Sequence, residues 1–326
     1  MKKRTLQATL IYNPRAGPAN LAAPLTLVAD MWQARGWAVT ITPTEYAGHA
    51  TELAREAAAA GHQVALAAGG DGTLGEVANG LAGSETALGA LPVGTANSFA
   101  QELRLPLPGR WGRHKLLKVS DALLNGRIHQ MDLGWVQNGE ADGRYWMLWA
   151  GIGADGYFVE QVEPRPTWSK KLGRLGYVIQ GIGLAPKFPK MHAWVEVDGQ
   201  VYEDDYVLVV VSMCRLYVGG EIVLSPQAKL DDGWFEVWLF RGETLAHAVY
   251  FLTLARMQKH LHNPDVTMVY GRDVTIRSQP IMPAHTDGEP AGHTPVHCQI
   301  KSGALRLLVP DTAPTDLFTQ SGEPFP

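Results

Sequence analysis

The first third of the chain alternates short apolar runs with longer amphipathic stretches, and this alternation constrains the fold more than any other feature. Apolar runs with the length of buried strands occupy residues 8–12, 37–42, 63–68 and 87–93. Stretches with apolar residues at helical spacing occupy residues 21–35, 50–60 and 74–81. Strands that alternate with helices in this way form a parallel sheet with helices on both faces. We therefore expect residues 1–133 to form a doubly wound, mainly parallel α/β domain.

After residue 133 the sequence changes to β-branched and aromatic runs that often alternate with polar residues. Such runs predict strands at residues 145–150, 192–197, 201–211, 234–240, 266–277, 296–300 and 304–309. The pairs Asp198-Gly199 and Ser302-Gly303 are typical of hairpin turns, and helical spacing returns at 169–184 and 243–260. We expect a second domain over residues 134–326, a mainly antiparallel β-sandwich. Its proline-rich tail after Pro310 either packs back on the first domain or stays loose.

The composition excludes several classes of protein. With 46% apolar and 18% charged residues, the chain can bury a sizeable core. The 28 lysines and arginines against 32 acids give a net charge of −4, so we expect no nucleic-acid partner. No apolar run is long enough for a membrane-spanning helix. Cys214 and Cys298 are too few for a disulfide framework. We expect a cytoplasmic protein with two free thiols.

Three loops that follow predicted strands carry the residue types of a phosphate site. In Gly69-Gly70-Asp71-Gly72-Thr73 (the 69–73 loop), glycines allow a polyphosphate to approach the backbone, and the following helix offers free N–H groups. Asn13-Pro14-Arg15-Ala16-Gly17 (the 13–17 loop) adds an amide and a guanidinium. Gly94-Thr95-Ala96-Asn97 (the 94–97 loop) adds a hydroxyl and another amide. Each loop alone could be an ordinary turn or helix cap. Because parallel strands end at one sheet edge, we expect one phosphate site.

These loops resemble the motifs of the diacylglycerol kinase catalytic domain. The similarity is greatest to the soluble bacterial lipid kinases, which are related to sphingosine and ceramide kinases. Later segments follow in the family's order, at residues 131–134, 150–156, 225–233 and 287–289. The resemblance covers about residues 7–310. It implies an NAD-kinase/phosphofructokinase-like first domain and a kinase that transfers the γ-phosphoryl group of ATP to a hydroxyl of diacylglycerol or a similar lipid.

The resemblance also implies which residues form the site. The family's ATP site corresponds to Asn13, Pro14, Arg15, Ala16, Gly17, Thr44, Gly70, Asp71, Gly72, Thr73, Leu74, Gly75, Glu76 and Thr95. Its proposed general base corresponds to Glu289, with Asp287 beside it near the metal-bound phosphates. Related sphingosine kinases assign the base role to the acid at Asp71 instead. We favour Glu289 as the base and Asp71 as the organiser of metal and phosphate. Gly75 and Ser98 depart from the family's usual Asn and Asp.

The resemblance implies Mg²⁺ as a second cofactor, and Mg²⁺ prefers the oxygen ligands that phosphoryl transfer also needs. In soluble bacterial members a structural Mg²⁺ site corresponds to the backbone carbonyls of Lys229 and Trp234 and to the carboxylate of Asp232. Asp132 would connect to that ion through water. The alternative is a solvated turn at residues 229–233. His285, His293 and His297 lack the spacing of a metal site, and we interpret them as strand or surface residues.

Residues 164–190 contain no acid and combine six lysines and arginines with aromatic and aliphatic side chains. This composition predicts a transient contact with an anionic membrane surface, and the alternative is a solvated helix packed on the second domain. Two other functions stay open: an NAD kinase-like phosphotransferase, which would share the glycine-rich loop, and a catalytically silent nucleotide- or lipid-binding regulator. The retained acids favour the lipid kinase. The sequence leaves the lipid and the oligomeric state open.

Overall fold

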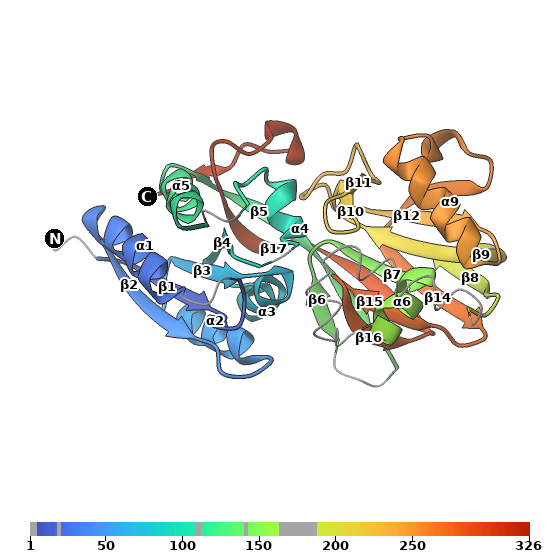
Figure 1. Ribbon diagram of the computed structural model, residues 1–326, viewed down its shortest axis with the longest axis horizontal. Coiled ribbons are helices and arrows are strands. Elements are labelled where there is room, and N and C mark those ends of the chain that lie inside the picture. The colour runs from blue at the N-terminus through green and yellow to red at the C-terminus, as the bar shows by residue number, and fades with distance from the viewer. Residues whose placement is uncertain (1–4, 18–20, 95, 108–111, 140–142, 163–187) are drawn as a thin grey trace.

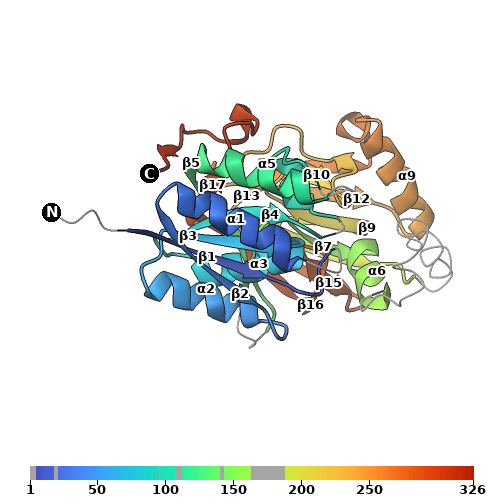
Figure 2. The same ribbon diagram turned by 60° about the vertical axis from the view of Figure 1, so that its left-hand side comes forward.

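The computed structural model describes residues 5–17, 21–94, 96–107, 112–139, 143–162 and 188–326. Its first part contains four parallel strands in the order β4-β3-β1-β2 (Figure 1). Their bounds are Leu6–Tyr12 (β1), Trp37–Pro43 (β2), Val64–Gly69 (β3) and Ala87–Pro92 (β4). Helices α1 (Ala22–Ala34) and α5 (Gly112–Leu124) cover one face, and α2 (His49–Ala59) and α3 (Asp71–Leu81) cover the other (Figure 2). The predicted doubly wound α/β fold is confirmed.

Burial in this domain follows the alternation of the sequence. The central strands β3 and β4 are buried along their whole length because helices cover both faces. Helix α1 turns Leu25, Val28 and Trp32 to the sheet at the spacing of one helix face. The indole of Trp32 also donates a hydrogen bond of 3.0 Å to Ser120 of α5. These contacts fix the sheet edge from which the three loops leave.

The second part is an antiparallel β-sandwich, as predicted. One sheet contains β8 (His192–Val197), β14 (Asp273–Gln279), β17 (Val296–Val309), β5 (Arg127–Gln137) and β6 (Arg144–Trp146). The other contains β13 (Val266–Gly271), β12 (Phe235–Arg241), β9 (Gln200–Ser212), β7 (Trp149–Gly153), β15 (Pro283–Thr286) and β16 (Glu289–His293). Strand β9 joins the sheets, since it pairs first with β8 and then with β7 and β12. Val195, Val209, Phe235 and Ile276 belong to the core cluster of this domain.

Smaller elements complete the molecule. Helix α6 (Ala154–Val162) follows β7, and α9 (Leu245–Arg256) with the 3₁₀ turn η2 (His260–His262) lies on the second domain. The short helix α4 (Ser98–Glu102) contacts the pair β10 (Leu216–Tyr217) and β11 (Ile222–Val223) through β10. The tail contains η3 (Thr315–Leu317) and β18 (Glu323–Pro324), which pairs with β5. Phe325 stacks on Trp37 of the first domain at 5.1 Å between ring centroids.

Strand β17 corrects one expectation from the sequence. The expected hairpin turn at Ser302-Gly303 is wrong, because the chain runs on as one strand from Val296 to Val309. Its register against β5 shifts between Lys301 and Leu305, which marks a β-bulge, and Gly303 takes the positive φ of 59° there. Beyond the bulge, β17 pairs in parallel with β4, so this strand belongs to the sheets of both domains. Residue 133, the expected domain boundary, lies inside β5.

Two other expected strands are each divided by a carboxylate that takes backbone N–H groups. The stretch 145–150 breaks between β6 and β7, where the N–H groups of Met147 and Leu148 donate to Asp287. The stretch 266–277 breaks between β13 and β14, where Arg272 and Asp273 donate to Asp198. The hairpin at Asp198-Gly199 is confirmed, with φ of 48° and 86°.

The remaining expectations divide between confirmed and undescribed segments. The helix expected at 243–260 is confirmed as α9 followed by η2. The helix expected at 169–184 lies outside the described residues, as do Thr95 and residues 164–187 of the expected membrane segment. Cys214 and Cys298 are both buried free thiols. Within the described ranges, no helix is long and apolar enough to cross a bilayer.

Candidate functional site

The 69–73 and 94–97 loops touch at the carboxyl edge of the sheet. The Gly69 carbonyl accepts hydrogen bonds from the N–H groups of Val93 (3.0 Å) and Gly94 (3.1 Å). A Cβ at Gly94 would lie 2.5 Å from the Cα of Gly70, and a Cβ at Gly69 would overlap the side chain of Thr73. Glycine is therefore required here because two backbones pass within contact distance.

The 13–17 loop joins the other two at the same edge. The N–H of Asn13 donates to the Ala68 carbonyl at 3.1 Å, and the Asn13 side-chain oxygen accepts the N–H of Arg15 at 2.8 Å. Gly17 has a φ of 73°, and a Cβ there would overlap the carbonyl of Val93. The structure thus brings all three loops together, with the side chains of Pro14 and Arg15 exposed and Ala16 half-buried.

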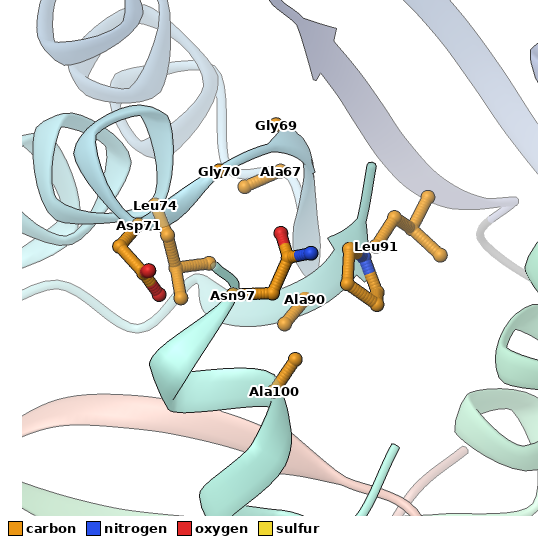
Figure 3. A pocket seen from close by; sticks show the side chains of 10 residues that line it. Ala67, Gly69, Gly70, Asp71, Leu74, Ala90, Leu91, Asn97 and Ala100 are labelled. Carbon is orange, nitrogen blue, oxygen red and sulfur yellow. The ribbon is translucent and has the colours of Figure 1, made fainter. Parts of the chain in front are cut away.

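Asp71 is the first residue of α3, and its side chain points to the start of α4 (Figure 3). Its two carboxylate oxygens accept the N–H groups of Ser98 (2.9 Å) and Phe99 (3.1 Å). Asn97 takes a left-handed conformation, and its amide bridges both backbone groups of Gly94 at 2.7 and 3.0 Å. The Asp71 carboxylate therefore fixes the 94–97 loop against the 69–73 loop.

The rest of the predicted ATP residues occupy several environments. The Glu76 carboxylate accepts the N–H groups of Gly48 (2.9 Å) and Ala50 (3.1 Å), so it caps α2. Thr44 donates its N–H to the carbonyl of Tyr12 at the end of β1, at 2.8 Å. The side chains of Thr73 and Leu74 are buried, whereas nothing lies within 4 Å of a Cβ built at Gly75. Side chains that line the pocket beside these loops come from Ala67, Leu74, Leu91, Asn97 and Ala100 (Figure 3).

Asp287 and Gly288 form the two-residue turn between β15 and β16, with φ of 54° and 84°. The Asp287 carboxylate accepts three backbone N–H groups, from Met147 (2.7 Å), Leu148 (2.9 Å) and Trp149 (3.2 Å). Burial raises the pKa of Asp287 to about 6, although these three donors oppose the shift. Asp287 therefore fastens its turn to the junction of β6 and β7.

Glu289 lies directly after this turn and reaches the first domain. A Cβ built at Gly72 would be 2.6 Å from Glu289 Oε1, so the carboxylate lies against the first turn of α3. Arg144 approaches the other oxygen, Oε2, at 3.9 Å, and its guanidinium donates to the Glu289 carbonyl at 3.0 Å. The side chain of Glu289 is 56% exposed. The N-terminal end of α3 and Arg144 both lie beside this carboxylate, which is thus placed next to the 69–73 loop.

The predicted metal residues gather near the bulge of β17. The buried Asp132 carboxylate accepts the N–H groups of Gly233 (2.6 Å) and Gly303 (2.7 Å). Burial raises the pKa of Asp132 and of Asp232, and the charge of Asp132 adds to the shift at Asp232. Lys229 donates to the Asp316 carbonyl at 2.7 Å, and the ring of Trp234 lies under the guanidinium of Arg272. Among the described residues no group of three or more His, Cys, Asp or Glu could hold a metal ion.

Two residues that hold the site together were not predicted from the sequence. Asn79 on α3 exchanges hydrogen bonds of 2.8 Å with the backbone of Tyr145, which docks β6 on the helix. The buried Glu102 carboxylate accepts the N–H groups of Arg215 (3.0 Å) and Leu216 (2.9 Å), which docks β10 on α4. Both residues join the two domains around the site, and no local motif marks them because their partners are backbone groups distant in sequence.

Three glycine-containing loops at one sheet edge, facing an acid on a β-sandwich, form the arrangement expected of a phosphotransferase. Comparison with known proteins gives the family. Residues 7–136 match the diacylglycerol kinase catalytic domain, and residues 151–309 match the YegS C-terminal NAD kinase beta sandwich-like domain. The chain belongs to the diacylglycerol kinase family and is a lipid kinase that uses ATP.

Individual relatives extend over most of the chain. A diacylglycerol kinase from Bacillus subtilis (strain 168) is 31% identical over 292 residues, which cover 89% of this chain and 91% of that protein. One from Staphylococcus carnosus (strain TM300) is 29% identical over 324 residues, or 98% and 100% of the two chains. A diacylglycerol kinase crystal structure from Bacillus anthracis str. Sterne has a TM-score of 0.67 at 23% identity and covers 96% of this chain and 100% of that one.

Proposed function

We propose that the enzyme transfers the γ-phosphoryl group of ATP to a hydroxyl of diacylglycerol or a similar lipid. The observation that carries this proposal is the approach of Glu289 to Gly72, which puts a carboxylate beside the loops that would bind the phosphates. In this scheme residues 1–133 form the nucleotide-binding unit and residues 134–326 the lipid-substrate unit, with β17 shared between them.

Glu289 is the general base in this proposal. The lipid hydroxyl gives its proton to the Glu289 carboxylate as its oxygen bonds to the γ-phosphorus. The bond from that phosphorus to the bridging oxygen breaks, and the electron pair leaves with ADP. Asp71 is the weaker alternative because both of its oxygens already accept N–H groups of α4. We assign Asp71 to holding the 94–97 loop, and Asp287 to holding the turn that carries Glu289.

The nucleotide contacts follow from the same geometry. Backbone N–H groups of the three loops and the first turn of α3 would bind phosphate oxygens. Arg15, exposed at this edge, would add a charge-assisted contact. Thr44 and Thr95 would complete the ATP site. Glu76 would act indirectly, because its carboxylate caps α2 directly after the segment that carries Thr44.

Two roles for Mg²⁺ belong to the proposal. When bound with ATP, the ion neutralises charge on the phosphates. A second, structural ion would take the Asp232 carboxylate and the carbonyls of Lys229 and Trp234, with Asp132 nearby. The donor chemistry fits, because burial and then the charges of Asp132 and Asp231 raise the pKa of Asp232, and a cation beside these acids would relieve that repulsion.

We also propose a cytoplasmic enzyme that contacts the membrane transiently. Residues 164–190 stay the candidate contact from the sequence. Among the described residues, the segment 249–261 on α9 and η2 and between them carries exposed apolar side chains that would suit the same membrane: Val249 (63%), Tyr250 (49%), Met257 (55%) and Leu261 (42%). Residues 245–264 contain no acid. Flotation with phosphatidylglycerol vesicles tests both surfaces, with wild-type protein as reference. V249S/Y250S tests the surface at α9, and K170E/K171E/R174E tests the segment 164–190.

The reaction itself is tested by transfer of labelled γ-phosphate from ATP with Mg²⁺. Separate tubes would contain dioleoylglycerol, a sphingoid base and NAD⁺. Label in dioleoylglycerol supports the proposal. Label in the sphingoid base alone keeps the lipid kinase activity but changes the proposed lipid substrate. Label only in NAD⁺ would contradict it in favour of an NAD kinase-like activity. Nucleotide binding without transfer in any tube would indicate a silent regulator.

A further inference from the structure

A buried polar network lies behind the turn that carries Glu289. His285 on β15 is buried, and its Nε2 is 2.6 Å from Asp155 Oδ2 at the start of α6. Tyr217 on β10, also buried, donates its hydroxyl to the same Asp155 oxygen. These three side chains come from three separate elements, and the catalytic scheme above uses none of them.

The hydrogen bonds define the state of the imidazole. The N–H of Gly288 donates to His285 Nδ1 at 3.2 Å, so Nδ1 must be an unprotonated acceptor. The remaining ring nitrogen, Nε2, then carries the proton and donates it to Asp155. A neutral His285 therefore links a backbone N–H of the turn to a carboxylate on α6. An aliphatic residue in place of His285 would leave the Gly288 N–H and the Asp155 carboxylate without the imidazole as a partner.

The surroundings leave the network little room to rearrange. A Cβ built at Gly151 on β7 would lie 2.5 Å from Asp155 Oδ2 and would overlap the His285 ring. Asp155 also benefits from its place in the first turn of α6, where the helix dipole favours a negative charge. Trp149 packs its ring edge-on against Tyr217 at 5.4 Å between centroids. The network is therefore held in one arrangement by packing as well as by hydrogen bonds.

The same network reaches α4 and the 94–97 loop of the first domain. Leu216, the neighbour of Tyr217, donates its N–H to the Glu102 carboxylate on α4. Gln101 on α4 donates to the Gly219 carbonyl at 2.7 Å. The start of α4 is the segment that Asp71 caps. A continuous set of contacts thus connects the 94–97 loop, α4, β10, Asp155 and His285 to the turn at Gly288.

We propose that His285, supported by Asp155 and Tyr217, is a positioning residue that holds the Asp287-Gly288 turn and thereby directs the Glu289 carboxylate toward the first turn of α3. This inference rests on the proposed role of Glu289 as general base. His285 does not touch the reacting atoms; it acts through the Gly288 N–H.

The substitution H285Q tests the link with little disturbance of the fold. The glutamine amide can still donate to Asp155, but it offers no acceptor at the Nδ1 position for Gly288. Y217F is a milder second variant, which removes one hydroxyl from the far end of the network. H297Q is the matched control. His297 Nε2 lies 2.9 Å from Asp273 Oδ1, so it forms a similar pair, but this pair does not contact the Asp287-Gly288 turn.

Two measurements decide the proposal. The first is kcat and KM with MgATP and dioleoylglycerol in phosphatidylglycerol micelles, for each variant in the wild-type and E289Q backgrounds. We expect H285Q to lower kcat at least about tenfold with little change in the KM for ATP, and to add less than about twofold to the loss in E289Q. The second is hydrogen exchange of the Gly288 amide, which should lose protection in H285Q and keep it in H297Q.

The outcomes separate this proposal from the proposed function. Unchanged kcat in H285Q, or a further tenfold loss in the E289Q background, would overturn the positioning role. If E289Q itself keeps full activity, the base assignment fails. Gly288 exchange in H285Q and Y217F then still shows whether His285 holds the turn, and full protection in both would overturn that part independently.

Discussion

Gly72→Ala is expected to separate folding from catalysis in this enzyme. Gly72 is the second residue of α3 and has an ordinary helical backbone, so alanine fits the helix itself. Replacing a helical glycine by alanine stabilises a protein by up to about 1 kcal/mol. The new methyl group, however, would lie 2.6 Å from Glu289 Oε1, well inside van der Waals contact. Because that atom ends a flexible, half-exposed side chain, the carboxylate would move away rather than the helix.

The size of the catalytic loss follows from the distance. Removing the overlap requires the carboxylate oxygen to retreat by roughly 1 Å, and a misplacement of about 1 Å can cost about 100-fold in rate. General-base catalysis contributes typically about 10²–10⁴-fold, which sets the upper limit. We therefore expect G72A to be at least as stable as the wild type, with a kcat reduced about 100-fold.

The assay combines urea unfolding with initial rates of dioleoylglycerol phosphorylation. G75A provides the stability reference in the same helix, because nothing lies within 4 Å of its new methyl group. A G72A protein that is stable and fully active would refute the placement of Glu289 as base. A G72A protein that is destabilised by more than about 1 kcal/mol would show that the helix, not the side chain, absorbs the overlap.

Three further predictions concern the supports of the site. G94A should raise the KM for ATP at least about tenfold and destabilise the protein by roughly 1–3 kcal/mol, since its methyl group would meet the Gly70 backbone; nucleotide titration and urea unfolding check this. E76A should cost about 1 kcal/mol in urea unfolding by removing the cap of α2, with E76Q intermediate. Burial raises the pKa of Glu236 on β12 to about 7, above its usual value, so its ionisation on going from pH 5 to 8 destabilises the folded state. E236Q should therefore be more stable than wild type at pH 8, by roughly 1–3 kcal/mol, and lose this advantage at pH 5, as measured by urea unfolding at both pH values.

The sequence was sufficient for the first domain because its patterns are local. Strands β3 and β4 are continuous apolar runs, and each leads into a glycine-containing loop at the sheet edge. The second domain was harder to predict where the same residue pair fits two different backbone structures. Ser302-Gly303 suits a hairpin turn and a β-bulge equally well. The bulge forms because β17 pairs on both sides of it with β5, which is distant in sequence.

The candidate site shows the same division. Motif positions predicted which loops meet, but they did not indicate which N–H groups each carboxylate accepts. Asp71, Glu76 and Asp287 all bind backbone N–H groups of other segments, so their observed contacts are structural. Such contacts depend on the tertiary fold and have no signature within a few residues of the acid. Glu289 stands apart, because its side chain reaches a helix start on the other domain.

In the proposed mechanism the three loops and Glu289 belong to different domains, so the junction between the domains bears on catalysis. The chain crosses between the domains along β5 and β17, which pair with each other from His297 to Val309. The weak point of this ribbon is the bulge between Lys301 and Leu305, where ladder pairing is interrupted. Asp132 lies at that point, and its carboxylate accepts N–H groups from Gly303 of the bulge and from Gly233. The carboxylate thereby supplies a hydrogen bond to β17 at the point where the ladder between β5 and β17 is interrupted.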